Sequence, residues 1–309
     1  MKELKVNSKR ARISALLLAP LLATASVTPI PAGASLGGQE VRGNTFAVGM
    51  TFKDVGVDSV CSGALIGPKL IVTAAHCVVG QDGSRNKGFI FTAPGTALDA
   101  AIDPRVTPPK IKKIYKPASY TNSSRSTGED IAFIELDKVI AKKGFIRIAT
   151  QAEIDALLQD QLVEGYGFGA IFETKTPYSR WPRKYRMNWR AVYDNGALKP
   201  RLELTSDVAA ACSGDSGGAI TTRLESGEEV LLAVLSGASM VQDVCGQKGI
   251  DGLYRMLVTT INPYLFLVKP IFNPADPAPI LKITCWKGKV KRVVKGLDPK
   301  CPKGFTLKK

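Results

Sequence analysis

The chain has 309 residues, a length that suits one large domain or two small domains with appendages. Its composition of 45% hydrophobic residues with 29 Gly and 19 Pro fits a soluble, turn-rich β protein. The net charge of +15 comes mostly from the two ends, because residues 1–34 contribute +4 and residues 281–309 contribute +9, which leaves +2 for the body. The basicity therefore belongs to the ends of the chain.

Residues 1–34 are predicted to be a secretory signal peptide. Five Lys and Arg against one acid precede the apolar run Ala15–Leu22. That run is too short to span a bilayer, and no other stretch of the chain is long enough either. Cleavage patterns of the A-x-A type end at Ala25 and Ala34. A cut after Ala25 would leave 26–34 as a short propeptide. The protein is expected to be exported and soluble.

The first motif is the stretch from Cys61 to Cys77, which contains His76, the single histidine of the chain. The apolar run that precedes His76 predicts a buried strand turning into a short helix. A lone histidine is by default a hydrogen-bonded structural residue, but it is also the only side chain here whose unperturbed pKa suits acid–base chemistry near neutral pH. Two segments further along the chain favour the catalytic interpretation.

Asp130 and Ser216 carry those two segments. Asp130 opens the alternating apolar strand Ile131–Leu136, a position that alone indicates only turn chemistry. Ser216 lies in Gly214-Asp-Ser-Gly-Gly218. Glycines on both sides leave its hydroxyl accessible and let backbone N–H groups converge on one point, as the oxyanion of an attacked carbonyl requires.

Short alternating strands separated by turn residues are predicted over 41–172. Clear examples are Thr45–Phe52, Gly88–Thr92, Val106–Tyr115 and Ile131–Leu136, and a short helix is predicted over Ala152–Leu162. Residues 178–190 interleave Arg and aromatic residues, a pattern that can bind nucleic acid. We favour a surface loop whose aromatics pack on the body, because no nucleic-acid-binding fold accompanies the pattern, and we expect no specific nucleic acid partner.

The six cysteines are even in number and fall into three locally spaced pairs. The pairs are Cys61 with Cys77, Cys212 with Cys245, and Cys285 with Cys301. This spacing indicates disulfides formed in an oxidising compartment. Metal binding is the alternative, but no C-x-x-C motif occurs and the one histidine has another use. No metal and no cofactor are therefore expected.

The order of the motifs separates two families of serine hydrolases. The segment around Ser216 also satisfies the G-x-S-x-G pattern of α/β-hydrolases, but those enzymes place their histidine after the serine. The order His76, Asp130, Ser216 resembles that of the trypsin/chymotrypsin family of serine endopeptidases. The resemblance covers about residues 35 to 268. Four further segments support it: Leu36–Gly38, Val163–Gly167, Leu235–Ala238, and Cys245 followed by Gly252-Leu-Tyr254.

This resemblance implies an all-β fold of two six-stranded antiparallel β-barrels, chymotrypsin-like, with the active site between them and a small C-terminal appendage. Residues 35–270 would form the protease domain. Ser216 would be the nucleophile, His76 the general base and acid, and Asp130 the residue that orients the imidazole. The N–H groups of Gly214 and Ser216 would form the oxyanion hole.

The resemblance also implies a specificity pocket. Ala210 stands where trypsin-like enzymes carry an Asp that attracts Lys or Arg. Without that acid, a basic side chain would be desolvated and unpaired, so cleavage after apolar residues is expected. Gly237, Ala238 and Gly252 would form the open walls of the pocket, and Ser236 would hydrogen-bond Asp130 from behind.

Activation follows from the same resemblance. In the family, a newly formed N-terminal amine pairs with the Asp before the nucleophile, which is Asp215 here. A cut after Ala34 would free Ser35 for that ion pair, so that removal of the signal peptide would itself activate the enzyme. The family usually begins with Ile-Val, and Ser35 departs from that pattern.

Beyond the protease domain, a Pro-rich linker is predicted over 271–280 and a basic tail over 281–309. The tail carries ten Lys and Arg against one acid, and Cys285 and Cys301 would close it into a hairpin. It is similar to short Lys-rich, Cys-paired modules at the ends of exported actinobacterial proteins. Two roles are open: charge-based attachment to an anionic cell-wall polymer, membrane headgroups or nucleic acid, or a solubilising appendage.

These observations predict a secreted serine endopeptidase that acts on proteins or peptides as a monomer. The alternatives are a catalytically silent binding protein on the same fold and a surface-attachment protein whose function lies in the tail. Reaction with an active-site serine probe distinguishes the first alternative. Deletion of 281–309 distinguishes the second.

Overall fold

The computed structural model describes residues 38–43, 46–54, 56–80, 82–99, 107–121, 129–142, 144–171, 178–190, 193–194, 197–198, 201–238, 247–272, 281–288, 290–296 and 301–307. The predicted signal peptide and most of the predicted linker lie outside these ranges. Strands dominate the described residues, and none of their helices has the length and apolar character needed to cross a membrane.

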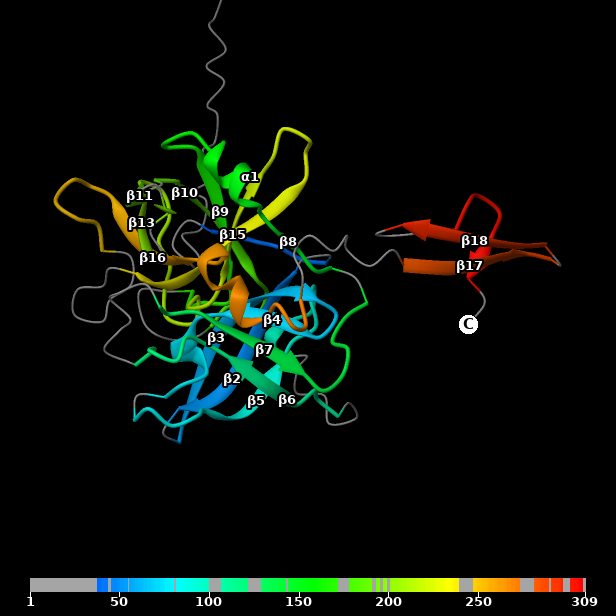
Figure 1. The fold of residues 1–309 in the computed structure, drawn as a ribbon, viewed down its shortest axis with the longest axis horizontal. Coiled ribbons are helices and arrows are strands. Elements are labelled where there is room, and N and C mark those ends of the chain that lie inside the picture. Colours follow the sequence, from blue (N-terminus) through cyan, green and yellow to red (C-terminus); the bar gives the residue numbers. More distant parts are fainter. Residues whose placement is uncertain are drawn as a thin grey trace, which may run out of the picture. The chain divides into compact units, whose positions relative to one another are not determined.

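The first barrel is a curled six-stranded antiparallel sheet (Figure 1). Its strands are β2 (Ala47–Asp54), β3 (Val57–Gly67), β4 (Leu70–Thr73), β5 (Lys87–Phe91), β6 (Ile111–Tyr115) and β7 (Ala132–Leu136), in the order β5-β2-β3-β4-β7-β6. Alternation on β2 places Val48, Met50 and Phe52 together in the barrel core. The four predicted strands correspond to β2, β5, β6 and β7. β6 starts later than predicted because Pro108 and Pro109 cannot donate to a ladder.

The second barrel is closed by its own first two strands. It contains β9 (Leu162–Gly167), β10 (Arg183–Asn188), β13 (Arg201–Ser206), β14 (Ala219–Arg223), β15 (Glu229–Ala238) and β16 (Tyr254–Thr260), in the order β10-β13-β16-β15-β14-β9. Pairing of β9 with β10 completes the circle. Two short strands join its outside: β1 (Gln39–Glu40) pairs with β10, and β8 (Arg147–Ile148) runs parallel to β15. A separate pair, β11 (Tyr193–Asp194) and β12 (Ala197–Leu198), forms a hairpin.

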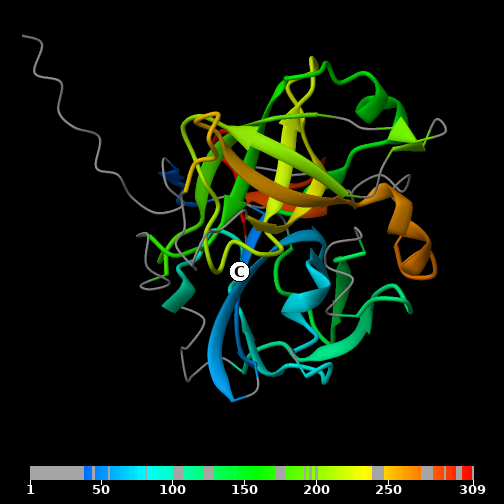
Figure 2. The ribbon, with the colours of Figure 1, turned by 90° about the vertical axis from the view of Figure 1, so that its left-hand side faces the viewer.

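The two barrels share a hydrophobic core, and Figure 2 shows the blue and cyan strands of the first against the green and yellow strands of the second. The side chains of β7 contribute to both hydrophobic cores. Ala132 and Ile134 face the core of the first barrel, whereas Ile131, just before the strand, and Phe133 pack with residues of the second barrel. Because successive side chains alternate across a strand, one apolar run covers both surfaces.

The basic and aromatic segment 178–190 contributes to this architecture. Tyr185 and Trp189 are fully buried, whereas Arg186 and Arg190 are exposed. For these four residues the aromatic side chains pack on the body and the charged ones face water, as predicted, whereas Arg183 is partly buried. The segment is not a loop throughout, because residues 183–188 form β10.

The helix predicted over 152–162 is shorter in the structure. α1 spans only Gln151–Asp155, because the residues after it turn to lead into β9, and Asp160 adopts a left-handed conformation with φ 62°. A 3-10 helix, η1 (Ala75–Cys77), carries His76 as expected. A second one, η4 (Asn262–Leu267), follows the second barrel on the boundary of the shared core.

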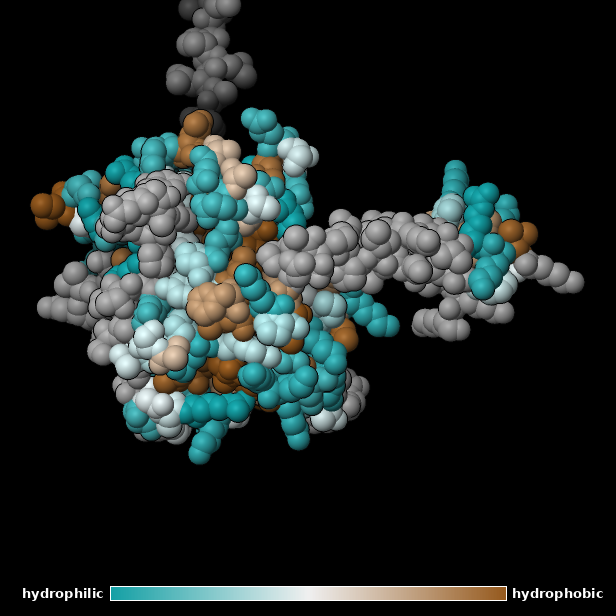
Figure 3. All heavy atoms as spheres, viewed as in Figure 1, coloured by the Kyte–Doolittle hydropathy of each residue, from teal (hydrophilic) through white to brown (hydrophobic). Residues whose placement is uncertain are grey.

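The described part of the C-terminal tail forms a three-stranded sheet of its own. β17 (Leu281–Lys287) lies between β18 (Val290–Gly296) and β19 (Thr306–Leu307), and the disulfide Cys285–Cys301 fastens it. The predicted hairpin therefore gains a third strand. In Figure 3 the described side chains of this module are largely hydrophilic, as are most exposed side chains over the barrels on the face shown.

Candidate active site

His76 and Asp130 form a tight pair between the first barrel's β4 and β7 ends. The imidazole Nδ1 of His76 lies 2.7 Å from Asp130 Oδ2, and the backbone N–H of His76 donates to Oδ1 at 2.9 Å. The hydroxyl of Ser236, on β15 of the second barrel, donates to Oδ2 at 2.6 Å. The carboxylate is fully buried, and these three contacts hold the imidazole in one orientation.

The pKa of Asp130 reflects this enclosure. Burial raises it, but the charge of His76 and the hydrogen bonds from His76 and Ser236 outweigh burial and lower the pKa to about 2. Asp130 is therefore an anion throughout the pH range in which an imidazole titrates. An anion at Nδ1 stabilises a proton at the opposite ring nitrogen.

Ser216 lies beside this pair. The N–H of Ser62 donates to its carbonyl oxygen at 2.7 Å, and that oxygen is 3.5 Å from Sγ of Cys77, the neighbour of His76. Ser216 is partly exposed, and its hydroxyl accepts or donates no hydrogen bond within the described part of the chain. The structure thus brings the two motif residues of the first barrel together with Ser216 of the second.

The turn 212–218 contains two backbone N–H donors, those of Gly214 and Ser216, that have no hydrogen-bond partner among the described residues. The carbonyl of Ser213 accepts from Ala170 N–H at 2.7 Å, and the carbonyl of Asp215 accepts from Gly218 N–H at 2.8 Å. A trans peptide directs its C=O and N–H in opposite directions, so the N–H of Gly214 points away from Ala170 and the N–H of Ser216 points away from the Gly218 amide. Neither N–H has a partner among the described residues, as an oxyanion site requires.

Ser62 supports this turn, although no sequence motif marks it. Its fully buried hydroxyl donates to the carbonyl of Gly214 at 2.8 Å and accepts from Phe168 N–H at 2.9 Å. Thr73 in turn donates to the Ser62 carbonyl at 2.7 Å. A side chain of β3 therefore fixes the oxyanion turn of the other barrel.

Asp215 points away from the reacting groups. Its buried carboxylate accepts from Gly169 N–H and Cys212 N–H, both at 2.8 Å. Ser35, its expected partner after cleavage, lies outside the described residues.

The expected specificity-pocket residues Ala210, Gly237, Ala238 and Gly252 all lie among the described residues. Ala210 is buried, and Gly237 and Ala238 lie at the end of β15. A Cβ built on Gly237 or Gly252 would meet no described atom within 4 Å, so both positions border open space. Cys212 is disulfide-bonded, and Cys245, its expected partner, lies outside the described residues.

The Cys61–Cys77 disulfide affects whether the residues around His76 could bind a metal ion. Ligand-type atoms of Cys61, His76 and Cys77 lie within 4.8 Å of one another. Both sulfurs are consumed by the disulfide, and His76 Nδ1 is engaged by Asp130. This donor set does not fit a metal ion, since thiolate and free imidazole nitrogens are the ligands that such a site needs.

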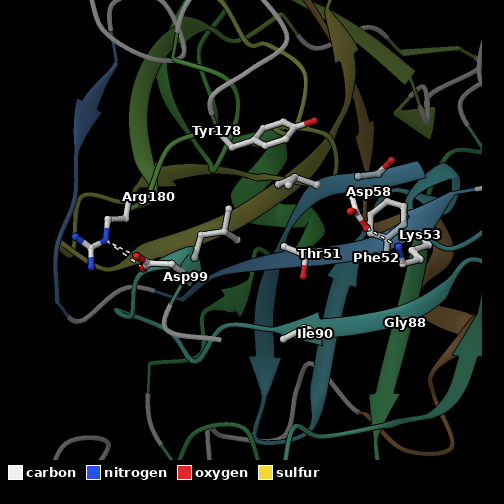
Figure 4. A pocket seen from close by; sticks show the side chains of 12 residues that line it. Thr51, Phe52, Lys53, Asp58, Gly88, Ile90, Asp99, Tyr178 and Arg180 are labelled. Carbon is white, nitrogen blue, oxygen red and sulfur yellow. Dashed lines mark hydrogen bonds and ion pairs between the residues drawn. The ribbon is translucent and has the colours of Figure 1, made fainter. Parts of the chain in front are cut away.

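A cavity of about 650 Å³ is lined by residues of β2, β3 and β5 together with Leu98, Asp99, Tyr178 and Arg180 (Figure 4). Apolar side chains that include Phe52 and Leu98 line it, together with the ion pairs Lys53–Asp58 at 3.1 Å and Arg180–Asp99 at 2.9 Å. Tyr178, another lining residue, packs so closely on Gly214 that a Cβ there would lie 2.9 Å from the ring.

Comparisons with known proteins place this geometry in a family context. The family model described as Trypsin matches residues 35–263. A trypsin-like protease of Streptomyces glaucescens is 28% identical over 250 residues, which cover 77% of this chain and 85% of that protein. The Spaetzle-processing enzyme of Drosophila melanogaster is 22% identical, over 63% of this chain and 55% of its own length. Coagulation factor IX of Cavia porcellus is 24% identical, over 66% and 72%.

Proposed function

The chain belongs to the trypsin family of serine endopeptidases, and on that premise we propose that it hydrolyses peptide bonds through His76, Asp130 and Ser216. The observation that carries the proposal is the pairing of His76 with buried Asp130 beside Ser216, which lies in a turn with two backbone N–H donors that have no partner among the described residues. Two chain segments of the first barrel and one of the second supply these groups, so the folded domain assembles the site.

The mechanism follows the template of trypsin-type catalysis. The Ser216 oxygen attacks the substrate carbonyl while Nε2 of His76 accepts the hydroxyl proton. The same proton passes to the departing amine as the C–N bond breaks, which leaves an acyl group on Ser216. Water then attacks this ester by the reverse path. Asp130 stabilises the imidazolium at each step, and the N–H groups of Gly214 and Ser216 stabilise the oxyanion.

We further propose that the enzyme cleaves after apolar residues. Ala210 places a methyl group where trypsin-like enzymes have a carboxylate, and the positions of Gly237 and Gly252 border open space. A Lys or Arg side chain entering such a pocket would lose hydration without gaining a counter-ion. An apolar side chain loses nothing comparable.

Hydrolysis of a mixed peptide library by the secreted mature protein tests both proposals, with cut sites determined by mass spectrometry. Ser216→Ala is the matched control. Cuts after apolar residues that disappear in the control support mechanism and pocket together. Cuts after Lys or Arg that disappear in the control support the proposed mechanism but contradict the proposed preference for apolar residues. No cutting by a folded protein that starts at Ser35 contradicts the catalytic proposal and favours a binding role on the same fold.

Secretion and activation belong to the same proposal. The disulfides fit an oxidising compartment, and the leader 1–34 supplies the export signal. Cleavage after Ala34 would free the Ser35 amine for Asp215, whose carboxylate is buried beside the oxyanion turn. A monomer suffices, because one chain contributes every group of the site. N-terminal sequencing of the secreted protein tests the cleavage site: a start far from Ser35 contradicts this route.

For the tail we propose binding to an anionic polymer of the cell surface. Lys287, Lys291, Arg292 and Lys303 are exposed, and two of these cations lie over rings, Lys291 over Trp286 at 5.9 Å and Arg292 over Phe305 at 5.4 Å. Exposed apolar surface that would enter a membrane is limited to Val290 among the described side chains of the tail. Charge attraction should dominate such binding.

Sedimentation with purified anionic cell-wall polymer tests the tail, with the full mature chain beside a variant lacking 281–309. Retention of the full chain that is lost in about 1 M salt is expected, because the screening length then falls to about 3 Å. The shortened variant should cleave peptides normally and fail to sediment. Equal sedimentation of both proteins, or binding that survives high salt, contradicts the proposal.

A further inference from the structure

The carboxylate of Asp215 occupies a niche that exists only because two residues of the second barrel lack side chains. A Cβ on Gly167 would lie 2.1 Å from Oδ1, and a Cβ on Gly169 would lie 2.3 Å from Oδ2. The carboxylate is fully buried and accepts two backbone N–H groups. A buried anion of this kind is costly unless positive charge compensates it.

Arg183 stands close to this niche on an unexpected face of its strand. Along β10, Arg183, Tyr185 and Met187 share the inward face, and the latter two are each only 1% exposed. The neighbouring residues Lys184 and Arg186 belong to the outer face. A guanidinium on the core side of a barrel is unusual, because charged groups are rarely buried without a counter-charge.

The register of β9 and β10 places Arg183 opposite the niche. Its cross-strand partner is Gly167, whose missing side chain makes room for Asp215 Oδ1. Directly paired residues of antiparallel strands have Cα atoms about 5 Å apart. The Nη2 of Arg183 also donates to the carbonyl of buried Gly38, where the protease body begins. Arg183 therefore links the start of the domain to the surroundings of Asp215.

The charge of Asp215 reaches both inward titratable groups of β10. Burial raises the pKa of Tyr185 well above its usual value, and the negative charge of Asp215 raises it further. Burial lowers the pKa of Arg183, and the charges of Glu40 and Asp215 oppose that shift. Glu40, on β1, is thus the other titratable group that acts on Arg183 within the described residues.

We propose that Arg183 is a positioning residue, a permanent cation that stabilises Asp215 and holds the oxyanion turn 212–216 in its competent form. This inference rests on the proposed endopeptidase function and concerns its regulation. The amine of a freed Ser35 exists only after cleavage and loses its charge near pH 8. A guanidinium is charged before and after cleavage and at every pH the fold survives. The oxyanion turn therefore depends only in part on N-terminal processing.

The test compares two N-termini in four proteins. Wild type, Arg183→Gln, Arg183→Lys and Lys184→Gln are each prepared with a Ser35 start and with a two-residue Gly-Ser extension before Ser35. Lys184→Gln is the matched control, because it removes the same charge from the adjacent outward residue, which pairs with Glu164 at 2.8 Å. The kcat and KM for a small apolar ester are measured from pH 6 to 10, together with Tm.

With the extended N-terminus, wild type and Lys184→Gln should keep kcat within about tenfold of the Ser35 start, whereas Arg183→Gln should lose about a hundredfold, the effect of a lost oxyanion donor. Arg183→Lys should restore most of that loss. With the Ser35 start, Arg183→Gln should lose activity above about pH 8 as the amine deprotonates, and wild type should not.

Three outcomes overturn the proposal. Extended Arg183→Gln as active as extended wild type shows that Arg183 does not hold the turn. Extended wild type as inactive as extended Arg183→Gln shows that the amine alone does. Loss in Arg183→Gln that Lys does not reduce, with a matching fall in Tm, assigns Arg183 a structural role. Failure of wild type with a Ser35 start to react with a fluorophosphonate removes the endopeptidase proposal instead, and with it the premise.

Discussion

The hydroxyl of Ser236 is one of the groups that keep Asp130 ionised. Its contribution can be measured through the stability of the protein in acid. A carboxyl whose pKa is depressed in the folded state adds stability above its unfolded value of about 4, and that stability is lost as pH falls toward 2. Removing the hydroxyl in Ser236→Ala raises the pKa of Asp130 toward its unfolded value, so this contribution to stability becomes smaller and its loss is complete at a higher pH. At pH 7 the free energy of unfolding should fall by about 2 kcal/mol.

Acid unfolding followed by circular dichroism, in a Ser216→Ala background that prevents autolysis, measures this shift. Ser84→Ala is the control, because Ser84 bonds the exposed carboxyl of Asp82 and should leave the midpoint in place. An unchanged midpoint in Ser236→Ala would contradict the role assigned to the hydroxyl.

Ser62→Ala should weaken catalysis without touching a reacting group. It leaves the buried N–H of Phe168 without its acceptor and frees the Gly214 carbonyl, at a cost of about 2 kcal/mol in unfolding free energy. Because the oxyanion turn loosens, kcat should fall at least about tenfold while KM changes little. Thr92→Val removes a comparable buried acceptor, that of Gly49 N–H, and should destabilise with kcat preserved. Equal kcat values in the two variants would refute the assignment.

At the scale of elements, α1 and its surroundings show how a short helix is held. Thr150 and Glu153 form a reciprocal capping box, and Arg147 binds both Glu153 and Glu228 through pairs of hydrogen bonds. Thr150→Ala should cost about 1 kcal/mol of unfolding free energy. Glu153→Gln should cost more, because it disturbs the cap and the arginine together. Chemical denaturation measures both, with kcat/KM unchanged; a smaller cost for Glu153→Gln would be inconsistent with the shared network.

The elements that the sequence predicts well are those with local signals. The apolar alternation of 131–136 and the run before His76 predict β7 and the β4–η1 turn because each pattern lies within a few residues. The helix predicted over 152–162 was wrong beyond residue 155, because pairing of β9 with β10 requires an extended chain from Leu162.

Residues whose roles come from distant partners were not predictable from the sequence. Ser62 meets Gly214 and Phe168 across separations of 152 and 106 residues. Arg183 resembles any other arginine of a basic segment until the register of β9 and β10 places it opposite Gly167. By contrast, the glycines around Ser216 marked that residue from the sequence alone.

At the scale of the whole molecule, two disulfides with the same sequence separation of 16 residues permit a matched comparison. Equal loops should contribute about equally to stability, near 3 kcal/mol each on a loop-entropy basis. The paired substitutions Cys61→Ala with Cys77→Ala should therefore lower the temperature of catalytic inactivation and, because Cys77 follows His76, also kcat. Cys285→Ala with Cys301→Ala should leave both unchanged.

Thermal inactivation of peptide cleavage distinguishes the two disulfides, with proteolysis of the tail as an independent readout. If removal of the tail disulfide lowers the inactivation temperature as much as removal of Cys61–Cys77, the tail is part of the catalytic body's stability and not a module of its own.

His76 is useful for spectroscopy as well as for chemistry. It is the single imidazole of the chain, and its Nδ1 is held 2.7 Å from a buried anion. In a protein labelled with isotopic histidine, every imidazole resonance therefore reports on this one ring, with no assignment by mutagenesis. Its protonation, its tautomer and the shift of the proton shared with Asp130 can be followed in the unmodified chain, during inhibitor binding and across pH. The chain therefore carries its own spectroscopic probe at the proposed active site.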